Sequence, residues 1–382
     1  MRVLHVITDL GLGGAERMLL KLARSLLSLG VEMEVVSLGE RNLLGAEIER
    51  AGIPVTALGM RQSSGLLFGI TRLAKHIRRY NPDVVQTWLY HADLVGLLAN
   101  QLAGGGRPLA WNLRCSDLDP ASAKFSTRLI RRALIGLSAV PDLVIANSAS
   151  GLAAHQAQGY RPRASMLLPN GFDLQEFVPD RAAGSDLRNA LDIGPEEKLI
   201  GMVARFHPMK DHISFLRAAT IASAQRPDLR FILVGQGSEP DGPLANMASK
   251  MGLRTSIRFL GRRTDLPAVF NALDLSTLTS AHGEGFANVL GEAMSCGTPC
   301  VATDVGDAAE IITATGRIVP PRDPDALAKA WLEMLALPPE RLRTLGNAAR
   351  QRVSQKYEIG MIAQRYAETY AALVRQSPTS RC

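Results

Sequence analysis

The segment that decides the fold is "VLHVITDLGLGGAERMLLKLARSLLSLGVEMEVVSL", residues 3–38. Two short apolar runs, 3–8 and 33–38, enclose a glycine-rich turn and a segment with apolar residues at helical spacing. This order predicts two parallel strands joined by a helix, in a sheet that is covered on both faces. The same alternation continues along the first half of the chain. We therefore expect a doubly wound α/β domain over residues 1–178.

A second domain is expected after a stretch rich in Gly, Pro and Asp. The predicted linker spans residues 177–184, and the alternation then begins again with "LIGMVARF" at 199–206. We predict a second doubly wound domain over residues 185–358, and an amphipathic C-terminal helix, 359–376, that completes the first domain. Ligands of parallel sheets bind beyond the carboxyl ends of the strands. Two such domains facing each other across a cleft would therefore place the site in that cleft.

Composition and charge narrow the classes of partner. The chain has 382 residues, 46% of them hydrophobic, and a formal charge of +7, which fits a globular protein of more than one domain. Five basic residues and no acidic ones lie between Arg61 and Asn81, and a second basic run spans Lys124 to Arg132. These runs predict either contact with an anionic membrane surface or solvated helix faces. Nucleic-acid binding is not expected, because stacking aromatic residues do not alternate with the basic ones.

The cysteines and the apolar segments bear on the cellular location. Four cysteines are too few for a disulfide framework and lack zinc-ligand spacing, so we expect reduced thiols at Cys115, Cys296, Cys300 and Cys382. The apolar run that ends at Asp9 is too short for a signal peptide, and no run reaches the roughly 18 residues of a membrane span. The expected location is the cytoplasm, with peripheral contact to the inner face of the cytoplasmic membrane.

The most informative stretch for chemistry is "GEGFANVLGEAMSCGTP", residues 283–299. Glu284 stands between two glycines after an apolar strand, and Glu292 lies in a segment expected to be helical from about Asn288. A carboxylate accepts two hydrogen bonds side by side, so one Glu suits the hydroxyls of a ribose and the other those of a sugar. An acidic helix start is the competing explanation. Backbone amides that open toward an anion are expected at Gly285, Phe286, Ala287 and Asn288.

Two cationic residues form the second group of candidate site residues. Arg205 ends a strand and Lys210 lies in the following loop, within "GMVARFHPMKDH". A departing diphosphate needs positive charge, which Arg supplies bidentately and Lys as a point charge, so no metal ion would be required. Two solvated surface cations are the alternative. In the first domain, Gly13 and Gly14 of "GLGGAER" let the backbone approach an anionic ligand at a helix start.

These motifs resemble those of glycosyltransferase family 4, retaining nucleotide-sugar glycosyltransferases whose fold is called GT-B. The resemblance covers nearly the whole chain: "GLGGAER", "NSASGLAAHQAQGY", "LPNGFD", the Arg205 and Lys210 pair, "GEGFANVLGEAMSCGTPCVATDVGD" and "GRIVPPRDPDALA". Its most specific part is the pair of glutamates with seven residues between them, Glu284 and Glu292. The ordered set of motifs is far more specific than a lone glycine loop.

The resemblance implies a role for each matched residue of the second domain. Glu292 resembles the family's ligand of the donor ribose, and Glu284 resembles its contact to the hydroxyls of the donor sugar. Arg205 and Lys210 resemble its diphosphate clamp. Arg262 lies in the loop that corresponds to the family's base-binding edge.

In the first domain the resemblance assigns Gly13 and Gly14 to the glycine loop, whose backbone reaches the donor phosphate and the acceptor. Many members also carry a His-x-His pattern after a strand, and here Gln86 and Trp88 stand in those places. His91 follows three residues later and is the candidate site histidine, in contact with donor sugar or acceptor. A helix cap or a packing residue is the alternative for His91.

Some acidic and histidine patterns of the sequence could indicate metal sites. The sequences "DLD" at 117–119 and "DPD" at 323–325 resemble the metal-binding Asp-x-Asp of the other major glycosyltransferase fold. The second is better explained as a capped helix start with Pro in its first turn, and neither is assigned to a metal. His207 and His212 lack ligand spacing and are expected to be loop residues. No cofactor is expected, because the nucleotide sugar is a substrate.

The resemblance implies transfer of a sugar from a nucleoside diphosphate donor, with UDP favoured over GDP, to an acceptor hydroxyl with retention of configuration. The basic first domain suggests a lipid-linked precursor of a polysaccharide or lipopolysaccharide as the acceptor. Three alternatives stay open: a soluble acceptor, an epimerase that cleaves the same donor bond, and a non-catalytic GT-B subunit. The epimerase is disfavoured, because its residue pattern differs from the one present here.

Overall fold

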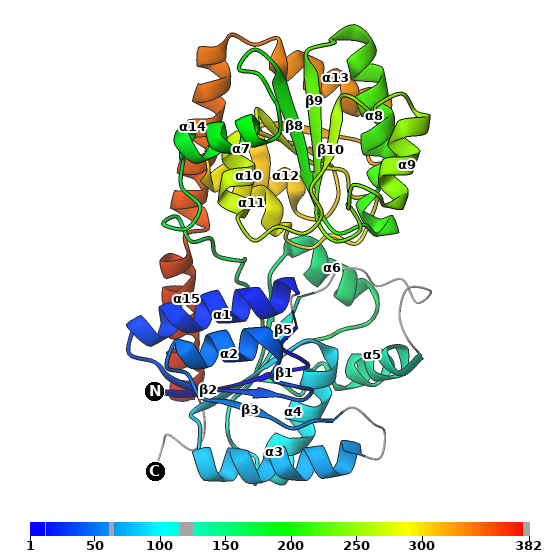
Figure 1. Ribbon diagram of the computed structural model, residues 1–382. Helices are drawn as coiled ribbons and strands as arrows, with labels where there is room; N and C mark the ends of the chain where they lie inside the picture. Colours follow the sequence, from blue (N-terminus) through cyan, green and yellow to red (C-terminus); the bar gives the residue numbers. More distant parts are fainter. Residues whose placement is uncertain (12, 61–64, 115–124, 377–382) are drawn as a thin grey trace. The chain divides into compact units, whose positions relative to one another are not determined.

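The computed structural model describes residues 1–11, 13–60, 65–114 and 125–376. The chain divides into two compact units, one formed by Met1–Gly171 together with the segment from Ile359 onward, the other by Phe172–Glu358. Each unit is built on one parallel sheet (Figure 1). This is the predicted fold class, two doubly wound α/β domains.

The first unit contains a seven-stranded parallel sheet in the order β3-β2-β1-β4-β5-β6-β7. Because the order reverses between β1 and β4, the chain winds outward from the centre in both directions. The strands are β1 Arg2–Ile7, β2 Glu32–Ser37, β3 Val55–Ala57, β4 Val84–Trp88, β5 Leu109–Leu113, β6 Leu143–Ala146 and β7 Ser165–Leu167.

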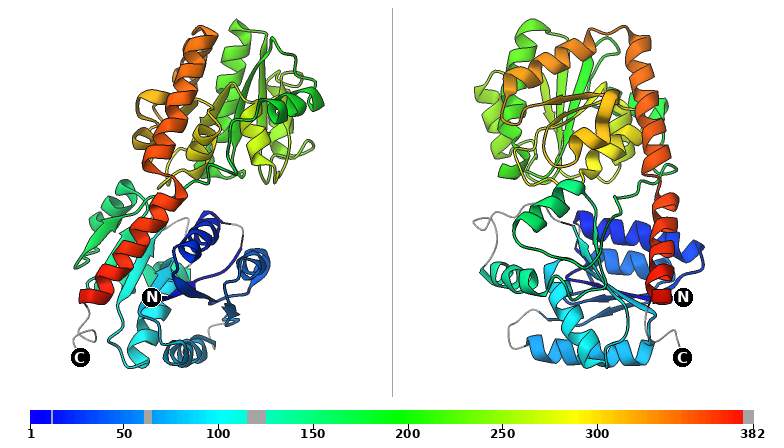
Figure 2. Two further views of the ribbon diagram at one scale, coloured as in Figure 1. Left: turned by 90° about the vertical axis from the view of Figure 1, so that its left-hand side faces the viewer. Right: turned by 180° about the vertical axis from the view of Figure 1, so that it is seen from behind.

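Helices cover both faces of this sheet (Figure 2). The core on one face is filled by residues of α1, α2 and α15, and the core on the other by residues of α3, α4 and α5. Two separate apolar layers explain why the strands are apolar at nearly every position. The helices are α1 Gly14–Ser28, α2 Asn42–Arg50, α3 Leu66–Tyr80, α4 Tyr90–Leu102, α5 Phe125–Leu137, α6 Ala149–Ala157 and α15 Ile359–Gln376.

The C-terminal helix α15 docks on the first unit through two tyrosines as well as apolar side chains. The hydroxyl of Tyr370 donates a hydrogen bond to Oε1 of Gln86, and Nδ2 of Asn112 donates to the hydroxyl of Tyr366 at 3.2 Å. All four residues are buried. The buried polar side chains on β4 and β5 need hydrogen-bond partners. They therefore favour the docking of a helix with hydroxyl groups at two positions four residues apart.

Replacing Tyr370 with phenylalanine is expected to lower the free energy of unfolding by about 1–3 kcal/mol, because Gln86 then keeps a buried amide without this donor. The phenyl ring preserves the packing, so the loss reports the hydrogen bond alone. Urea unfolding of the full chain measures it. An unchanged unfolding midpoint would show that the buried amide finds another partner.

The second unit contains a six-stranded parallel sheet in the order β10-β9-β8-β11-β12-β13. Here the order reverses between β8 and β11. The strands are β8 Lys198–Val203, β9 Leu229–Val234, β10 Ile257–Phe259, β11 Leu275–Leu278, β12 Cys300–Thr303 and β13 Arg317–Val319.

Two apolar cores enclose this sheet as well. One contains residues of α7, α10, α11, α12 and α14, and the other contains residues of α8, α9 and α13. The bounds are α7 Arg181–Ala190, η2 Pro208–Lys210, α8 His212–Gln225, α9 Pro243–Lys250, α10 Leu266–Ala272, α11 Asn288–Ser295, α12 Ala308–Ile312, η3 Thr313–Thr315, α13 Pro324–Leu335 and α14 Pro339–Lys356.

The boundary between the units differs from the sequence expectation. The first unit ends at Gly171 rather than at residue 178, and the predicted linker 177–184 lies within the second unit. Phe172 and Phe177 are buried in the second unit's core, and Asp180 caps α7 by accepting from the amide of Ala183 at 3.0 Å. The Gly, Pro and Asp residues of this stretch therefore serve a surface loop and a helix start.

Candidate active site

In the second unit, the predicted donor residues other than Arg262 lie on loops and a helix that follow the two strands where the strand order reverses. The loops that follow β8 and β11, residues 204–211 and 279–287, leave neighbouring strands at their carboxyl ends. Helices that follow these two strands belong to opposite cores, α8 to one and α11 to the other. The loops therefore diverge at this point, which is where open parallel sheets bind their ligands.

Lys210 and Glu284 form the centre of this region. Nζ of Lys210 makes an ion pair with Oε1 of Glu284, and Oγ of Ser280 donates to the same oxygen at 2.5 Å. The Glu284 side chain is only 9% exposed and that of Lys210 17%. A buried carboxylate held by two donors is fixed in position. Of the predicted catalytic residues, the structure thus brings these two into contact.

Hydrogen bonds lock the two loops to each other. Oγ1 of Thr279 donates to the carbonyl of Lys210 at 2.7 Å, and the amide of Ala281 donates to the carbonyl of Met209 at 2.8 Å. Behind them, Oγ1 of Thr303 donates to the carbonyl of Ser280 at 2.7 Å. The ion pair consequently sits on a rigid support, which a preorganised electrostatic site requires.

Gly306 is a site residue that the sequence analysis did not single out. Its φ is +65°, and a Cβ built on it would lie 2.4 Å from the carbonyl oxygen of Glu284 and 2.6 Å from that of Gly285. The next residue, Asp307, donates its amide to the carbonyl of Gly285 at 3.0 Å. The loop after β12 therefore supports the backbone of Glu284 by an approach that only glycine allows. The stretch "VGD" at 305–307, directly after a predicted strand, is the sequence signal from which Gly306 could have been predicted.

Glu292 and the predicted amides belong to α11, which begins at Asn288 as predicted. No side-chain hydrogen bond caps this start at Ala287. Phe286 and Ala287 are buried, and Glu292 is half-buried one turn into the helix. The positive end of α11 thus lies next to Gly285, on the chain segment that carries Glu284.

Arg205 and Arg262 lie at the same edge of the sheet but are exposed. Arg205 follows β8, where the amide of Phe206 donates to the carbonyl of Gln236 at 2.7 Å. Arg262 follows β10, next to Gly261, whose amide donates to the carbonyl of Ser238 at 2.7 Å. Both cations therefore stand on loops that are held in place, with side chains in solvent. No hydrogen bond or ion pair among the described residues joins either of them to Glu284.

The glycine loop of the first unit follows β1, beside the point where that sheet's order reverses. Gly13 caps α1 with extended backbone and is exposed, as is Gly14. A Cβ built on Gly13 would lie 2.2 Å from Oε2 of Glu16. The carboxylate of Glu16 therefore rests on the start of α1, and burial raises its pKa. The predicted anion position is thus already occupied by a carboxyl group of the chain itself.

His91 lies in the first turn of α4, after β4. It is half-buried, and burial lowers its pKa, which favours the neutral imidazole. The preceding N-cap residue, Leu89, has φ +73° and ψ 156°, a strained conformation for a non-glycine residue. Gln86 and Trp88, in contrast, are fully buried. Nε1 of Trp88 donates a hydrogen bond to Nδ1 of His5 at 3.2 Å.

The remaining motifs have structural roles where they are described. Asp323 caps α13 by accepting from the amide of Ala326 at 2.9 Å, with Pro324 in the first turn, as predicted. Nδ1 of His207 accepts from the amide of Met209 at 3.2 Å, as fits the expected loop residue. His212, in contrast, is buried in the first turn of α8 rather than in a loop. Cys296 and Cys300 are buried free thiols.

Several predictions fall on residues outside those that the structure describes. They are Arg61, Cys115, the "DLD" at 117–119, Lys124 and Cys382. Within the described ranges, no helix is long and apolar enough to cross a membrane.

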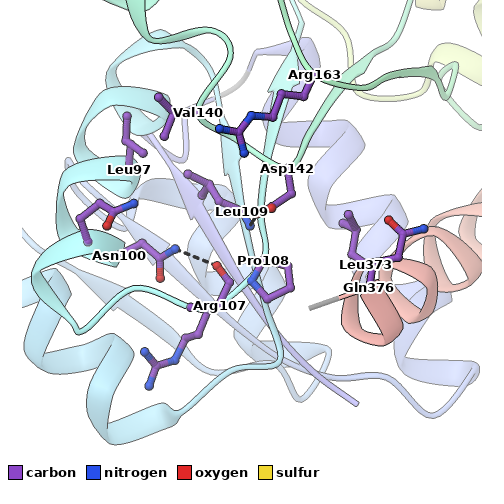
Figure 3. A pocket seen from close by; sticks show the side chains of 12 residues that line it. Leu97, Asn100, Arg107, Pro108, Leu109, Val140, Asp142, Arg163, Leu373 and Gln376 are labelled. Carbon is purple, nitrogen blue, oxygen red and sulfur yellow. Dashed lines mark hydrogen bonds between the residues drawn. The ribbon is translucent and has the colours of Figure 1, made fainter. Parts of the chain in front are cut away.

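A cavity of about 390 Å³ lies elsewhere in the first unit (Figure 3). It is lined by Arg107 and Pro108 before β5, by Asp142 before β6, and by Gln376 at the end of α15. This is the amino-terminal edge of the sheet, opposite to the glycine loop and His91. None of the predicted site residues lines it.

Comparison with known proteins agrees with this architecture. The family model "Glycosyltransferase Family 4" matches residues 12–176, and the model "Glycosyl transferases group 1" matches residues 197–336. A D-inositol 3-phosphate glycosyltransferase of Mycobacterium marinum is 38% identical over 170 residues, which cover 42% of this chain and only 34% of that protein. The lipopolysaccharide core biosynthesis mannosyltransferase LpsB of Rhizobium meliloti is 29% identical over 61% of this chain and 66% of LpsB.

Among solved structures, Anabaena HepE in complex with UDP superimposes with a TM-score of 0.84 at 26% identity, over 97% of this chain and 100% of HepE. HepE has also been solved in complex with UDP-glucose. The two family models match the two parallel-sheet units in the order in which the chain builds them. The chain therefore belongs to glycosyltransferase family 4 and has the GT-B fold.

Proposed function

We propose that this glycosyltransferase transfers a sugar from a UDP-sugar, with a GDP-sugar as second candidate, to a hydroxyl of a lipid-linked polysaccharide or lipopolysaccharide precursor. Transfer proceeds with retention of configuration and without a metal ion. The observation that carries the proposal is the buried Lys210–Glu284 pair on locked loops at the reversal of the second sheet. Such a pair provides one cation for a diphosphate and one carboxylate for sugar hydroxyls, side by side.

In the proposed reaction the bond between the anomeric carbon and the diphosphate breaks, and the acceptor oxygen forms the new bond on the same face. Lys210 and Arg205 neutralise the charge that develops on the leaving diphosphate. Glu284 accepts hydrogen bonds from the sugar, and Glu292 accepts those of the ribose. The acceptor proton passes to an oxygen of the leaving phosphate, so no side-chain nucleophile is needed.

The choice of donor and acceptor class is supported by the relatives. HepE binds UDP and UDP-glucose, and the similarity extends over nearly the full length of both chains. LpsB acts in lipopolysaccharide core biosynthesis. GDP stays in the test as the second candidate, because the exposed Arg262 at the expected base-binding edge does not distinguish the two bases.

A donor screen tests the proposal. UDP, GDP, ADP and their common sugars are compared by thermal shift, with and without EDTA, on the wild type and on Glu292→Ala. We expect stabilisation by uridine nucleotides that EDTA does not change and that Glu292→Ala loses, because the variant cannot bind the ribose hydroxyls. A well-folded chain that no nucleotide stabilises would favour the non-catalytic subunit. Turnover with a water-soluble acceptor as efficient as with a lipid-linked one would contradict the acceptor class.

The acceptor class also draws support from the surface of α3 and α5. Four large apolar side chains there are exposed: Leu67 (78%), Phe68 (64%), Phe125 (74%) and Leu129 (61%). Arginines accompany them, since the guanidinium carbons of Arg72 and Arg128 lie 5.6 and 5.7 Å from the ring centres of Phe68 and Phe125. Exposed apolar residues among cations are typical of a surface that rests on an anionic bilayer.

The double variant Phe68→Ser/Phe125→Ser is therefore expected to bind vesicles containing anionic lipid at least 10-fold more weakly than the wild type, because two large apolar contacts are lost. Co-sedimentation with vesicles of anionic and of neutral lipid measures this, and Leu98→Ser on α4, another exposed apolar residue, is the control. Equal binding of the wild type to both kinds of vesicle would count against membrane contact.

A further inference from the structure

Arg114 follows the last residue of β5, and its guanidinium makes no hydrogen bond with the described part of the chain. Its Nε, Nη1 and Nη2 atoms are all buried, and none has a hydrogen-bond partner among the residues described. An arginine stays protonated even in such surroundings, although burial lowers its pKa. Five unsatisfied N–H donors in a buried guanidinium are costly, and proteins rarely keep them without a ligand to satisfy them.

Arg131 of the same unit is a buried arginine with a structural role, and its contacts can be compared with those of Arg114. It is 8% exposed, its Nη2 donates to Oε1 of Gln158 at 2.7 Å, and its guanidinium lies 5.7 Å from the ring centre of Tyr90. Arg114 has the aromatic contact only, with its guanidinium carbon 4.8 Å from the ring centre of Trp88. Of these two buried arginines, only Arg114 lacks every side-chain hydrogen bond among the described residues.

Arg114 lies at the end of its strand where ligands of parallel sheets bind. The side chain extends from β5 over Trp88 of β4, and Trp88 is paired with Ile7 at the end of β1. Tyr366 of α15 and Glu16 in the first turn of α1 lie near enough to interact with the charge of Arg114, but no hydrogen bond from the guanidinium to either is present among the described residues. The guanidinium thus lies at the carboxyl edge of the first sheet, close to where the strand order reverses.

We propose that Arg114 binds a phosphate group carried by a substrate. A guanidinium presents its donors in a planar fork that matches the oxygens of a phosphate. The inference rests on the proposed function, which supplies two phosphate-bearing substrates: the nucleotide donor and a lipid-linked acceptor. The chemistry recognised is the same in both, and the experiment separates them.

The test uses inorganic phosphate and UDP as probes on the full chain, with Arg114→Met compared with the wild type and with Arg131→Met. Phosphate is expected to raise the Tm of the wild type by about 3 °C at about ten times its Kd, and chloride of equal ionic strength is the blank. Arg114→Met is expected to lose this rise. Without phosphate its Tm should equal or exceed that of the wild type, because an unpaired buried charge is removed. Arg131→Met should melt at a lower temperature and keep the phosphate effect.

The outcomes decide both the site and the source of the phosphate. A phosphate-induced rise that is equal in wild type and Arg114→Met overturns the proposal. Loss of that rise with the UDP effect intact assigns Arg114 to the other substrate, the acceptor, and loss of both assigns it to the donor. Failure of every nucleotide to stabilise the wild type would refute the proposed function, while inorganic phosphate still tests Arg114. If Arg114→Met does not fold, Arg114→Gln removes the charge and is compared in the same way.

Discussion

Replacing Lys210 with methionine is expected to lower turnover about 10²–10³-fold and the free energy of unfolding by about 3–5 kcal/mol. The catalytic loss follows from removing a fixed cation at the leaving diphosphate. The loss of stability follows from leaving Glu284, 9% exposed, with a buried charge and without its ion-pair partner. Release of the nucleoside diphosphate from the donor identified in the screen measures the first effect, and urea unfolding measures the second.

A second substitution separates the two effects. In Lys210→Met/Glu284→Gln the buried charge is gone and Ser280 retains an oxygen to donate to, so most of the lost stability should return. Turnover should remain as low as in Lys210→Met, or lower, because the carboxylate for the sugar is now missing as well. Wild-type turnover in Lys210→Met would exclude its role at the diphosphate. A double variant no more stable than the single one would exclude the buried charge as the cause.

Replacing Gly306 with alanine is expected to abolish UDP-dependent stabilisation and to lower the free energy of unfolding by about 2–4 kcal/mol. The new methyl group would lie 2.4 Å from the carbonyl oxygen of Glu284, so the backbone of that residue has to move. Because Glu284 and Lys210 are paired, both would leave the positions that the locked loops now impose. Thermal shift with UDP and urea unfolding of the ligand-free chain test the two parts.

Gly252 offers a matched control in the same unit. Its φ is +80°, close to the +65° of Gly306, but a Cβ built on it meets nothing within 4 Å. Gly252→Ala should therefore show only the strain of the left-handed backbone, about 1–2 kcal/mol, with the full effect of UDP. If both variants lost the UDP effect equally, the close approach at Gly306 would not be what holds the site.

Much of the local structure could be predicted from the sequence because it depends on neighbouring residues. The start of α11 at Asn288 and the capped start of α13 at Asp323 follow from short patterns, and the structure confirms both. The two parallel sheets follow from continuous apolar runs that alternate with amphipathic helices. These signals are local, because a few consecutive residues determine a helix cap or an amphipathic face.

The boundary between the units shows where such local signals mislead. Gly, Pro and Asp residues at 177–184 indicate a break in regular structure, but a break can equally be a loop within a domain. Phe172 and Phe177 enter the core of the second unit, and only the contacts of their rings reveal that. Phe172, for example, stacks on Phe286 at 6.0 Å between ring centres, across more than a hundred residues of chain.

The sequence by itself determined which residues are candidates for the site. They are two glutamates, two cations and a glycine loop, and each of these groups follows an apolar strand. Tertiary structure alone decided which of them meet. Lys210 and Glu284 are 74 residues apart and become partners because β8 and β11 are neighbours in the sheet. It also placed Gly306 against the backbone of Glu284 and left the guanidinium of Arg114 without a hydrogen-bond partner in the part of the chain that the structure describes. Strand order brings distant segments together, and strand order is set by packing over the whole domain rather than by any local pattern.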